Sequence, residues 1–298
     1  MPGLNLSYRS EYYDILAQKP AFNLDMPIYL TAYKQMRLLR PLNESKAKDD
    51  NGYHVVDVGT GTGRVIRNLT DALIKDIDLS KLRFTGVDTA SHVIDWARGT
   101  VANPQVGSVS YLVGSAVSLR ELEAFSGPPA VDLLIFSAGG VSLLHEPTVA
   151  IEKFLGEVAG ILRPGSGRAY IAVLKTFIGA EAREVVSKVS GLLDSCLAEV
   201  VPSAAYPGTI YRESKEGVRS DGNILMMDDC FEVVTKGSDG QDIVIGKDAS
   251  TCKSRILKAG ELLQLAAAVG LEFVQEEETC LETIFVFRVP LEMTKGSL

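Results

Sequence analysis

Short apolar runs alternate with amphipathic segments between residues 53 and 175. Three of those segments, at 62–74, from Ser91 onward and at 147–162, space their apolar residues as one side of a helix does. The apolar runs between them are short enough for buried strands: YHVVDVG, RFTGVD, VSYLVG, VDLLIFS and RAYIAVL. Strands that alternate with helices predict right-handed βαβ units and a parallel sheet.

The pattern changes after residue 176. A helical stretch at 180–199 is followed by three strand-like segments with turn-forming residues between them: TIYRES, NILMMDDCFEVV and QDIVIGKDAS. The earlier pattern then returns with a helix at 258–269 and the strands LEFVQEE and ETIFVFRV. We therefore expect a small antiparallel sheet inserted into the main one.

The whole pattern predicts an α/β fold, with a Rossmann-like, seven-stranded, mostly parallel sheet and helices on both of its faces. The first forty residues predict two amphipathic helices, broken near Pro20 and Pro27, and a polar linker follows at 43–52. The expected division is an N-terminal helical cap, a ligand-binding core, and an inserted helix and antiparallel sheet that form a lid or a dimer surface. The ranges are 1–45 for the cap, 53–175 and 258–290 for the core, and 176–257 for the insertion.

Composition and charge exclude several classes of protein. The chain has 298 residues and a net charge of −8, which argues against a nucleic-acid substrate held by phosphate contacts. The first residues lack the charged-then-apolar pattern of a secretory signal and no apolar run reaches the roughly 20 residues needed to cross a bilayer, so we expect a cytoplasmic protein with no membrane partner. Four separated cysteines and three histidines lack the spacing of a metal site, so none is expected.

A glycine-rich loop, residues 57–64 (DVGTGTGR), follows the first strand and opens a helix. Gly59, Gly61 and Gly63 allow a ligand to approach the backbone, and the helix start offers free N–H donors. A dinucleotide fingerprint needs glycine where Arg64 stands, and no Lys-Ser or Lys-Thr follows to make a phosphate loop. The loop therefore fits a ligand without a pyrophosphate.

Two further strand ends extend this candidate site. Asp88 ends RFTGVD, where a carboxylate can accept hydrogen bonds from both hydroxyls of a ribose; a turn residue or a helix cap is the alternative. Gly114, Ser115 and Ala116 follow the third strand, where the edge of an adenine would lie. Ser115 is a candidate acceptor for the adenine amino group, and a plain turn is the alternative.

These motifs resemble, in order, those of the class I S-adenosylmethionine-dependent methyltransferases, in particular the small-molecule group whose members begin with a Tyr-Asp helix. The matching segments run from the N-terminus to Leu174: YDILA, DMPIYL, VVDVGTGTGRV, GVDTASHVIDWAR, VDLLIFSAGGVSLLH and ILRPGSGRAYIAVL. A weaker match lies in AGELLQLAAAVGLEFV. Thr60 stands where many relatives have cysteine, and Ser115 stands where aspartate is common.

The resemblance implies that the chain binds S-adenosyl-L-methionine and transfers its methyl group. The acceptor it implies is a small, fairly apolar metabolite of secondary metabolism, with O-methylation favoured. The alternative is a protein of the same fold that binds this cofactor in a non-methylating role, as a rearrangement catalyst or an interaction module. The implied cofactor-binding residues are Tyr13, Asp57, Gly59, Thr60, Gly61, Gly63, Arg64, Asp88, Thr89, Gly114, Ser115, Ala116, Ser137 and Ala138.

The acceptor side has fewer candidates. Methyl transfer from a sulfonium is an in-line displacement that depends on positioning, and a hydroxyl acceptor also benefits from a base. His145, eight residues beyond the fourth strand, is the candidate base; capping the next helix or bracing the cofactor pocket is the alternative. The candidate acceptor-binding residues are Tyr12, Tyr29, Met226 and Phe231, with the core of the inserted sheet as the alternative for the last two. The edge of that sheet also offers a surface for a homodimer.

Overall fold

The computed structural model describes residues 6–39, 52–73, 81–100, 108–146, 149–196 and 200–291. All but the last residue of the predicted linker at 43–52 lies outside the described residues. The elements that the patterns predict are found in the predicted order along the chain, with ends shifted by a few residues.

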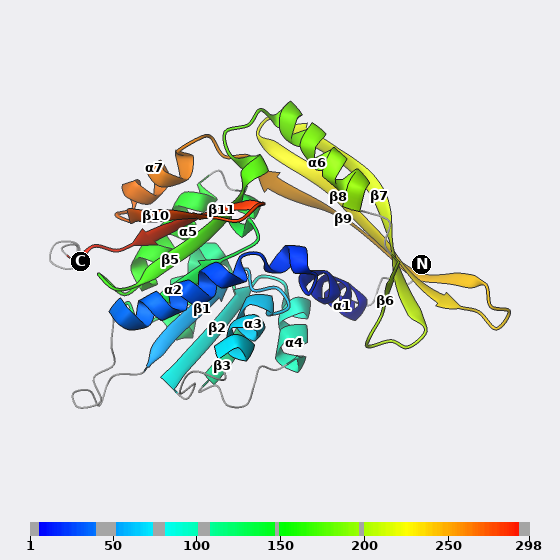
Figure 1. Cartoon of the computed structure of the whole chain (residues 1–298), viewed down its shortest axis with the longest axis horizontal. Coiled ribbons are helices and arrows are strands. Elements are labelled where there is room, and N and C mark those ends of the chain that lie inside the picture. Colours follow the sequence, from blue (N-terminus) through cyan, green and yellow to red (C-terminus); the bar gives the residue numbers. More distant parts are fainter. Residues whose placement is uncertain are drawn as a thin grey trace.

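A seven-stranded sheet forms the centre of the molecule (Figure 1). Its strand order is β10-β11-β5-β4-β1-β2-β3, in which β1 to β5 run parallel and β11 runs antiparallel to both of its neighbours. This confirms the predicted fold class. The strands are β1 (Tyr53–Val58), β2 (Leu82–Asp88), β3 (Ser108–Val113), β4 (Leu133–Phe136), β5 (Arg168–Leu174), β10 (Glu272–Glu278) and β11 (Glu282–Arg288).

Helices cover both faces of this sheet, which is why its central strands are almost continuously apolar. Val55 packs with the first face and its neighbour Val56 with the second, because successive strand residues point to opposite sides. The first face is covered by α2 (Met26–Leu39), α3 (Arg64–Leu73) and α4 (Ser91–Gly99), and the second by α5 (Ala150–Ile161) and α7 (Glu261–Ala268). Short 3₁₀ turns lie at 20–23 (η1), 116–121 (η3), 123–125 (η4), 140–143 (η5) and 175–177 (η6).

The insertion forms a second, antiparallel sheet of order β6-β7-β8-β9, with α6 (Ala182–Cys196) lying along it (Figure 1). Its strands are β6 (Val200–Pro202), β7 (Thr209–Asp221), β8 (Ile224–Lys236) and β9 (Asp242–Arg255). The edge strand β9 exposes Ile243, Val244 and Ile245. The predicted homodimer through this sheet, like the predicted domain division, stays a prediction.

The first helix, α1 (Leu6–Ala17), connects the two sheets. On one side Tyr12 stacks on Phe231 of β8, with ring centroids 4.4 Å apart. On the other side Ser10 donates to the His92 carbonyl of α4, and Asp14 pairs with Arg67 of α3. Three of the buried residues of α1 are polar: Ser10, Glu11 and Asp14. The sequence analysis expected a simple amphipathic helix and did not predict this.

The second helix begins where the sequence predicted a break. Pro27 occupies the first turn of α2, directly after Met26. A proline is tolerated there because the first N–H groups of a helix have no partner within it. Pro20 in turn opens η1, so each proline starts an element.

Candidate functional site

The three glycines of the loop after β1 differ in what surrounds them. All three have positive φ values, of 65° at Gly59, 53° at Gly61 and 85° at Gly63. A Cβ at Gly63 would lie 2.6 Å from the hydroxyl of Tyr111, and one at Gly59 would lie 2.8 Å from the ring of Phe136. A Cβ at Gly61 would meet nothing within 4 Å, so this glycine is where the loop leaves space for a ligand.

Asp88, at the end of β2, reaches this open point of the loop. Its Oδ2 accepts the Gly61 N–H at 2.9 Å, and its Oδ1 accepts the Ala90 N–H at 3.0 Å, at the start of α4. An ionised carboxylate has about four lone-pair sites, so acceptor capacity remains for the two hydroxyls of a ribose. The helix-cap and ligand-binding roles predicted for Asp88 are thus compatible. Thr89, the residue between these contacts, lies at the same edge.

Asp57, the fifth residue of β1, is buried beneath the loop at 1 % exposure. Its Oδ2 accepts a hydrogen bond from Thr60 Oγ1 at 2.7 Å, and its Oδ1 has no hydrogen-bond partner among the described residues. Burial raises the pKa of this carboxyl group to about 7. Buried polar atoms are normally hydrogen-bonded, so the unpartnered Oδ1 of Asp57 is consistent with a polar ligand group binding at this loop.

Arg64 anchors the N-terminal segment to the loop. Its guanidinium makes a bidentate pair with Asp25, both contacts at 2.7 Å, and also donates to the Phe22 carbonyl and to Ser137 Oγ. The predicted contact of Arg64 with the cofactor stays a prediction. The side chain itself is engaged within the protein, whereas the first backbone N–H groups of a helix such as α3 have no partner within the helix.

A strained turn follows β4 at residues 137–140. Ala138 has a φ of 55°, a conformation that costs about 1–3 kcal/mol outside glycine and is found mainly at functional sites. A Cβ at Gly140 would lie 2.3 Å from the Phe136 ring, the same ring that limits Gly59. The turn with Ser137 and Ala138 therefore packs beside the glycine loop.

The segment after β3 adjoins Asp88 as well. Gly114 donates its N–H to the Asp88 carbonyl at 2.9 Å. Ser115 Oγ accepts from the Val117 N–H at 3.4 Å and caps η3, whose first residue is Ala116. The structure thus supports the turn alternative for Ser115, and its contact with adenine stays a prediction.

On the α1 side, Tyr13 donates its hydroxyl hydrogen bond to Asp229 Oδ2 of β8 at 2.5 Å. Burial and the neighbouring Asp229 raise the pKa of Tyr13 well above its usual value, so the phenol stays protonated. Tyr12 and Phe231 are buried against each other, as the core-packing alternative for Phe231 predicts. Their roles in acceptor binding stay predictions.

Strand alternation separates Met226 from these residues. Asp229 and Phe231 lie on the face of β8 that meets α1, and Met227 has the same parity. Met226 lies on the opposite face, so of the two methionines Met227 is the one that shares the face of Asp229.

His145 lies just beyond η5. Its Nδ1 is 2.9 Å from the Leu143 carbonyl, which makes Nδ1 the protonated nitrogen and leaves Nε2 as the acceptor. Nε2 lies 4.0 Å from Glu146 Oε1, a carboxylate that Lys253 of β9 approaches at the same distance. The general-base role of His145 stays a prediction.

Glu282, at the start of β11, is a buried acid that the sequence analysis did not identify. It is 7 % exposed, and burial raises the pKa of its carboxyl group to about 7. Tyr29 of α2, fully buried, lies within electrostatic reach of Glu282, Asp25 and Arg64. The only signal in the sequence is an acid that opens the apolar strand ETIFVFRV.

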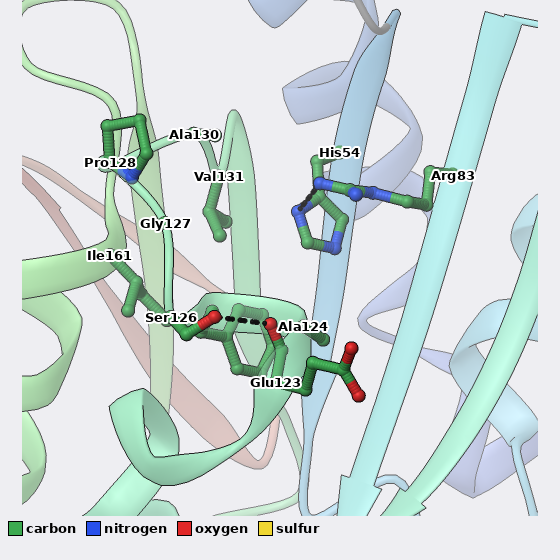
Figure 2. A pocket seen from close by; sticks show the side chains of 11 residues that line it. His54, Arg83, Glu123, Ala124, Ser126, Gly127, Pro128, Ala130, Val131 and Ile161 are labelled. Atoms are coloured by element: carbon green, nitrogen blue, oxygen red, sulfur yellow. Dashed lines mark hydrogen bonds between the residues drawn. The ribbon is translucent and has the colours of Figure 1, made fainter.

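A cavity of about 360 Å³ lies at the other end of the sheet (Figure 2). His54 of β1 and Arg83 of β2 line it from the amino ends of their strands, facing the loop from Glu123 to Val131. Arg83 donates to His54 Nδ1 at 2.8 Å, so His54 Nε2 carries the proton and donates to Thr85 Oγ1 at 2.9 Å. The cavity is separate from the glycine loop, which lies at the carboxyl ends.

The stability of the fold should fall in acid because of His54. Burial and the nearby Arg83 lower its pKa from 6.5 to about 3, so below pH 6.5 the unfolded chain binds a proton that the folded chain excludes. Stability is therefore fully present above pH 6.5 and is lost as the pH falls toward 3, by about 1.4 kcal/mol per pH unit for one proton. Urea unfolding at pH 7, 5 and 4 measures this slope. A His54→Asn variant should show a shallower slope, and an equal slope would contradict the assignment.

No group of three or more His, Cys, Asp or Glu side chains among the described residues is arranged to hold a metal ion. None of the described helices combines the length and apolar character needed to cross a membrane.

Comparison with known proteins identifies the family. Residues 55–165 match the model of the methyltransferase domain family. The N-methyltransferase FrzE of Cladobotryum sp is 30% identical over 285 residues, which are 95% of this chain and 94% of that protein.

Solved structures share the fold. An S-adenosylmethionine-dependent methyltransferase from Clostridium acetobutylicum ATCC 824 superposes with a TM-score of 0.59 at 9% identity, covering 95% of this chain and 99% of that one. Streptomyces venezuelae DesVI gives a TM-score of 0.58 at 14% identity, covering 96% and 100%. At these identities the likeness concerns the fold alone.

The geometry fits the cofactor of that family. The space at Gly61, the remaining acceptor capacity of Asp88 and the unpaired oxygen of Asp57 match a ligand with a ribose and a charged amino-acid end. When bound, S-adenosylmethionine supplies an electrophilic methyl group on sulfur. The chain therefore belongs to the class I S-adenosylmethionine-dependent methyltransferases.

Proposed function

We propose that this enzyme methylates an amine nitrogen of a small molecule that carries positive charge. Nitrogen takes the place of the oxygen acceptor favoured from sequence. The name of the Cladobotryum relative, an N-methyltransferase aligned over nearly the whole of both chains, supports nitrogen. The observation on this chain that carries the proposal is the acidic surface where α1 meets the antiparallel sheet.

Carboxylates predominate at that surface. Asp229 accepts from Tyr13, and Asp248 lies 3.3 Å from Arg9 Nε. Glu213 of β7 interacts electrostatically with Tyr12, the neighbour of Tyr13 on α1, and so does Asp229. Among the described side chains that interact electrostatically here, Arg9 opposes three carboxylates, a balance that attracts a cationic acceptor.

This acidic surface adjoins the cofactor residues. His92, at the start of α4, lies within electrostatic reach of both Asp88 and Asp248. Since Asp88 contacts the glycine loop, an acceptor held by the carboxylates would lie near the cofactor. Binding in that arrangement supplies the proximity on which methyl transfer depends.

The nitrogen that attacks the methyl carbon must be neutral. A bound ammonium first releases a proton to solvent; its lone pair then attacks the methyl carbon, the carbon–sulfur bond breaks, and the product ammonium loses its extra proton to solvent. A phenol must likewise lose a proton, near a pKa of about 10, before it attacks. The raised pKa of Tyr13 makes that residue unsuited to take up such a proton.

The test is a panel of primary and secondary amines, each matched with the alcohol or phenol of the same carbon skeleton. Purified enzyme receives labelled S-adenosylmethionine, and methylated product and S-adenosylhomocysteine are measured by mass spectrometry. We expect turnover of cationic amines and little of their oxygen counterparts. Turnover of the phenols alone would overturn the proposal in favour of O-methylation, with His145 as the candidate base. Cofactor binding without turnover across amines and phenols would contradict it too.

Asp229→Asn should weaken the binding of the amine acceptor and leave the binding of S-adenosylmethionine unchanged. We expect the KM of the amine to rise roughly 10-fold, because a hydrogen bond or ion pair to a charged group contributes about 1.5–3 kcal/mol. The affinity for S-adenosylmethionine, measured by calorimetry, should stay within about 2-fold. Asp228→Asn is the matched control, since Asp228 lies on the opposite face and pairs with Arg219 and Thr251. Equal effects of the two variants would argue against the acidic surface as the acceptor site.

A further inference from the structure

The cavity at the amino ends of β1 and β2 is lined by an arginine that has no acidic partner among the described residues. Figure 2 shows the Arg83 side chain reaching from β2 to the His54 ring of β1, and its one hydrogen bond to a described residue joins Nη2 to Nδ1 at 2.8 Å. Its Nε is buried and has no partner there. A guanidinium carries five N–H donors and stays charged at any ordinary pH. Arg83 therefore brings to the cavity a positive charge whose donors are largely unused.

Arg163, the other cation that acts on His54, is already neutralised. It donates from Nε to Asp132 Oδ1 at 2.7 Å and from Nη2 to the Ala130 carbonyl at 3.2 Å. His54 adds no charge, because burial and the two nearby arginines lower its pKa to about 3. Among the described residues that line the cavity Glu123 is the one acid, and it lies on the exposed loop. The buried end of the cavity is therefore positive, and its exposed side carries a negative charge.

Contacts between distant segments hold the remaining wall of the cavity in place. The N–H groups of Ala130 and Val131 donate to the Ile161 carbonyl at the end of α5, at 3.1 and 3.0 Å. The Phe125 ring stacks beside the His54 ring, with centroids 5.8 Å apart and planes 15° apart. Val131 and Ile161 lie on the side of the cavity opposite the guanidinium (Figure 2). The cavity thus combines a cation with an apolar wall, and the protein itself holds both in position.

We propose that this cavity is a second ligand site, which binds a small organic carboxylate through the Arg83 guanidinium and packs the apolar body of that ligand against Phe125 and Ile161. A guanidinium and a carboxylate are both planar and can form two parallel hydrogen bonds. A cavity of about 360 Å³ lies within the usual range for small-molecule sites. A monoanion suits it better than phosphate, because Glu123 repels a dianion more strongly. The site is independent of the proposed amine methylation, whose residues lie away from this end of the sheet.

The three histidines of the chain report where a carboxylate binds, because they lie in three different places. His54 lines the cavity, His92 lies near the cofactor residues, and His145 follows η5. Benzoate is the probe. In ¹⁵N-labelled protein at pH 7 it should shift the ring nitrogens of His54 alone, both without S-adenosylmethionine and with the cofactor at saturation. Signals of His54 that do not move, a shift of His92 or His145 in their place, or a His54 shift that the cofactor abolishes would overturn the proposal.

The second test measures affinity by calorimetry. Benzoate should bind roughly 10-fold more tightly than benzamide, its uncharged analogue, and than inorganic phosphate. Arg83→Gln should weaken benzoate binding by roughly 10-fold or more, because a hydrogen bond between charged groups is lost. Arg212→Gln, which removes an exposed arginine of β7, is the matched control and should leave the affinity within about 2-fold. Benzamide or phosphate that binds as tightly as benzoate, or an Arg83→Gln variant that binds benzoate like the parent, would overturn the proposal.

A third measurement does not depend on the folding of the Arg83 variant. Glu123 is exposed on the loop, so Glu123→Gln removes the negative charge from the exposed side of the cavity without disturbing the core. Benzoate should then bind about 2- to 5-fold more tightly, the size of effect expected for one exposed charge. Glu121→Gln, an exposed acid that does not line the cavity, is the control and should leave the affinity unchanged. An unchanged or weaker affinity in Glu123→Gln, or an equal gain in both variants, would overturn the proposal.

Discussion

Replacing Asp88 by alanine is expected to weaken the binding of S-adenosylmethionine by roughly 10- to 150-fold. A carboxylate that accepts from the ribose hydroxyls contributes about 1.5–3 kcal/mol, because hydrogen bonds to a charged acceptor are stronger than neutral ones. The same substitution removes the acceptor of the Gly61 N–H and so loosens the loop at its open point. Calorimetric titration with the cofactor measures the loss.

Asp95→Ala is the matched control for that variant. Asp95 lies on α4, is 70% exposed and pairs with Arg98 on the surface, so its removal should leave cofactor affinity within about 2-fold. Asp88→Asn should fall between the two, since an amide keeps one acceptor oxygen without the charge. An unchanged affinity in Asp88→Ala would mean that the cofactor does not lie across this part of the loop.

Replacing Asp25 by alanine is expected to destabilise the fold by about 3–5 kcal/mol. Asp25 is 2 % exposed and makes both contacts of the bidentate pair with Arg64, which is itself buried. Removing one partner leaves a buried guanidinium without its counter-charge, which is the costly way to break such a pair. Urea unfolding at pH 7 measures the loss of unfolding free energy.

Two controls separate charge from packing. Asp95→Ala, which breaks the exposed pair with Arg98, should cost less than about 1 kcal/mol. The double variant Asp25→Leu, Arg64→Met should recover much of the stability lost in Asp25→Ala, since well-packed apolar residues often replace a buried pair without loss. A loss below about 1 kcal/mol in Asp25→Ala would contradict the role of this pair in anchoring the N-terminal segment to the glycine loop.

Much of the fold follows from patterns local to the sequence. The runs YHVVDVG and RFTGVD predicted β1 and β2 to within a residue or two, because strands buried on both faces must be apolar throughout. The start of α2 was predicted less accurately, because the sequence analysis placed a break at Pro27. Pro27 suits either a break or a first helical turn, and only packing against β4 and β5 selects the latter.

Part of the candidate site was likewise predictable from local sequence patterns, and part was not. The glycines of the loop and Asp88 were identified from sequence because each stands at a strand end, and the carboxyl ends of parallel strands meet at one edge. The contact of Arg64 with the cofactor stays a prediction, and its side-chain pair with Asp25, a residue 39 positions away, was not predicted. Met226 and Met227 were indistinguishable by type, and strand parity places only the second on the face of Asp229.

The sequence by itself determined the order of the elements, the place of the glycine loop and the strand end that bears Asp88, because these depend on spacing within a few residues. Only the tertiary structure decided which distant side chains meet: Asp229 with Tyr13, Asp25 with Arg64, and Arg64 with Ser137 of the turn after β4. Such contacts depend on how whole elements pack, and local patterns carry no information about the partner. Arg64, at the start of α3, shows this directly, because its guanidinium contacts both Asp25 before α2 and Ser137 after β4, which are far apart in the sequence.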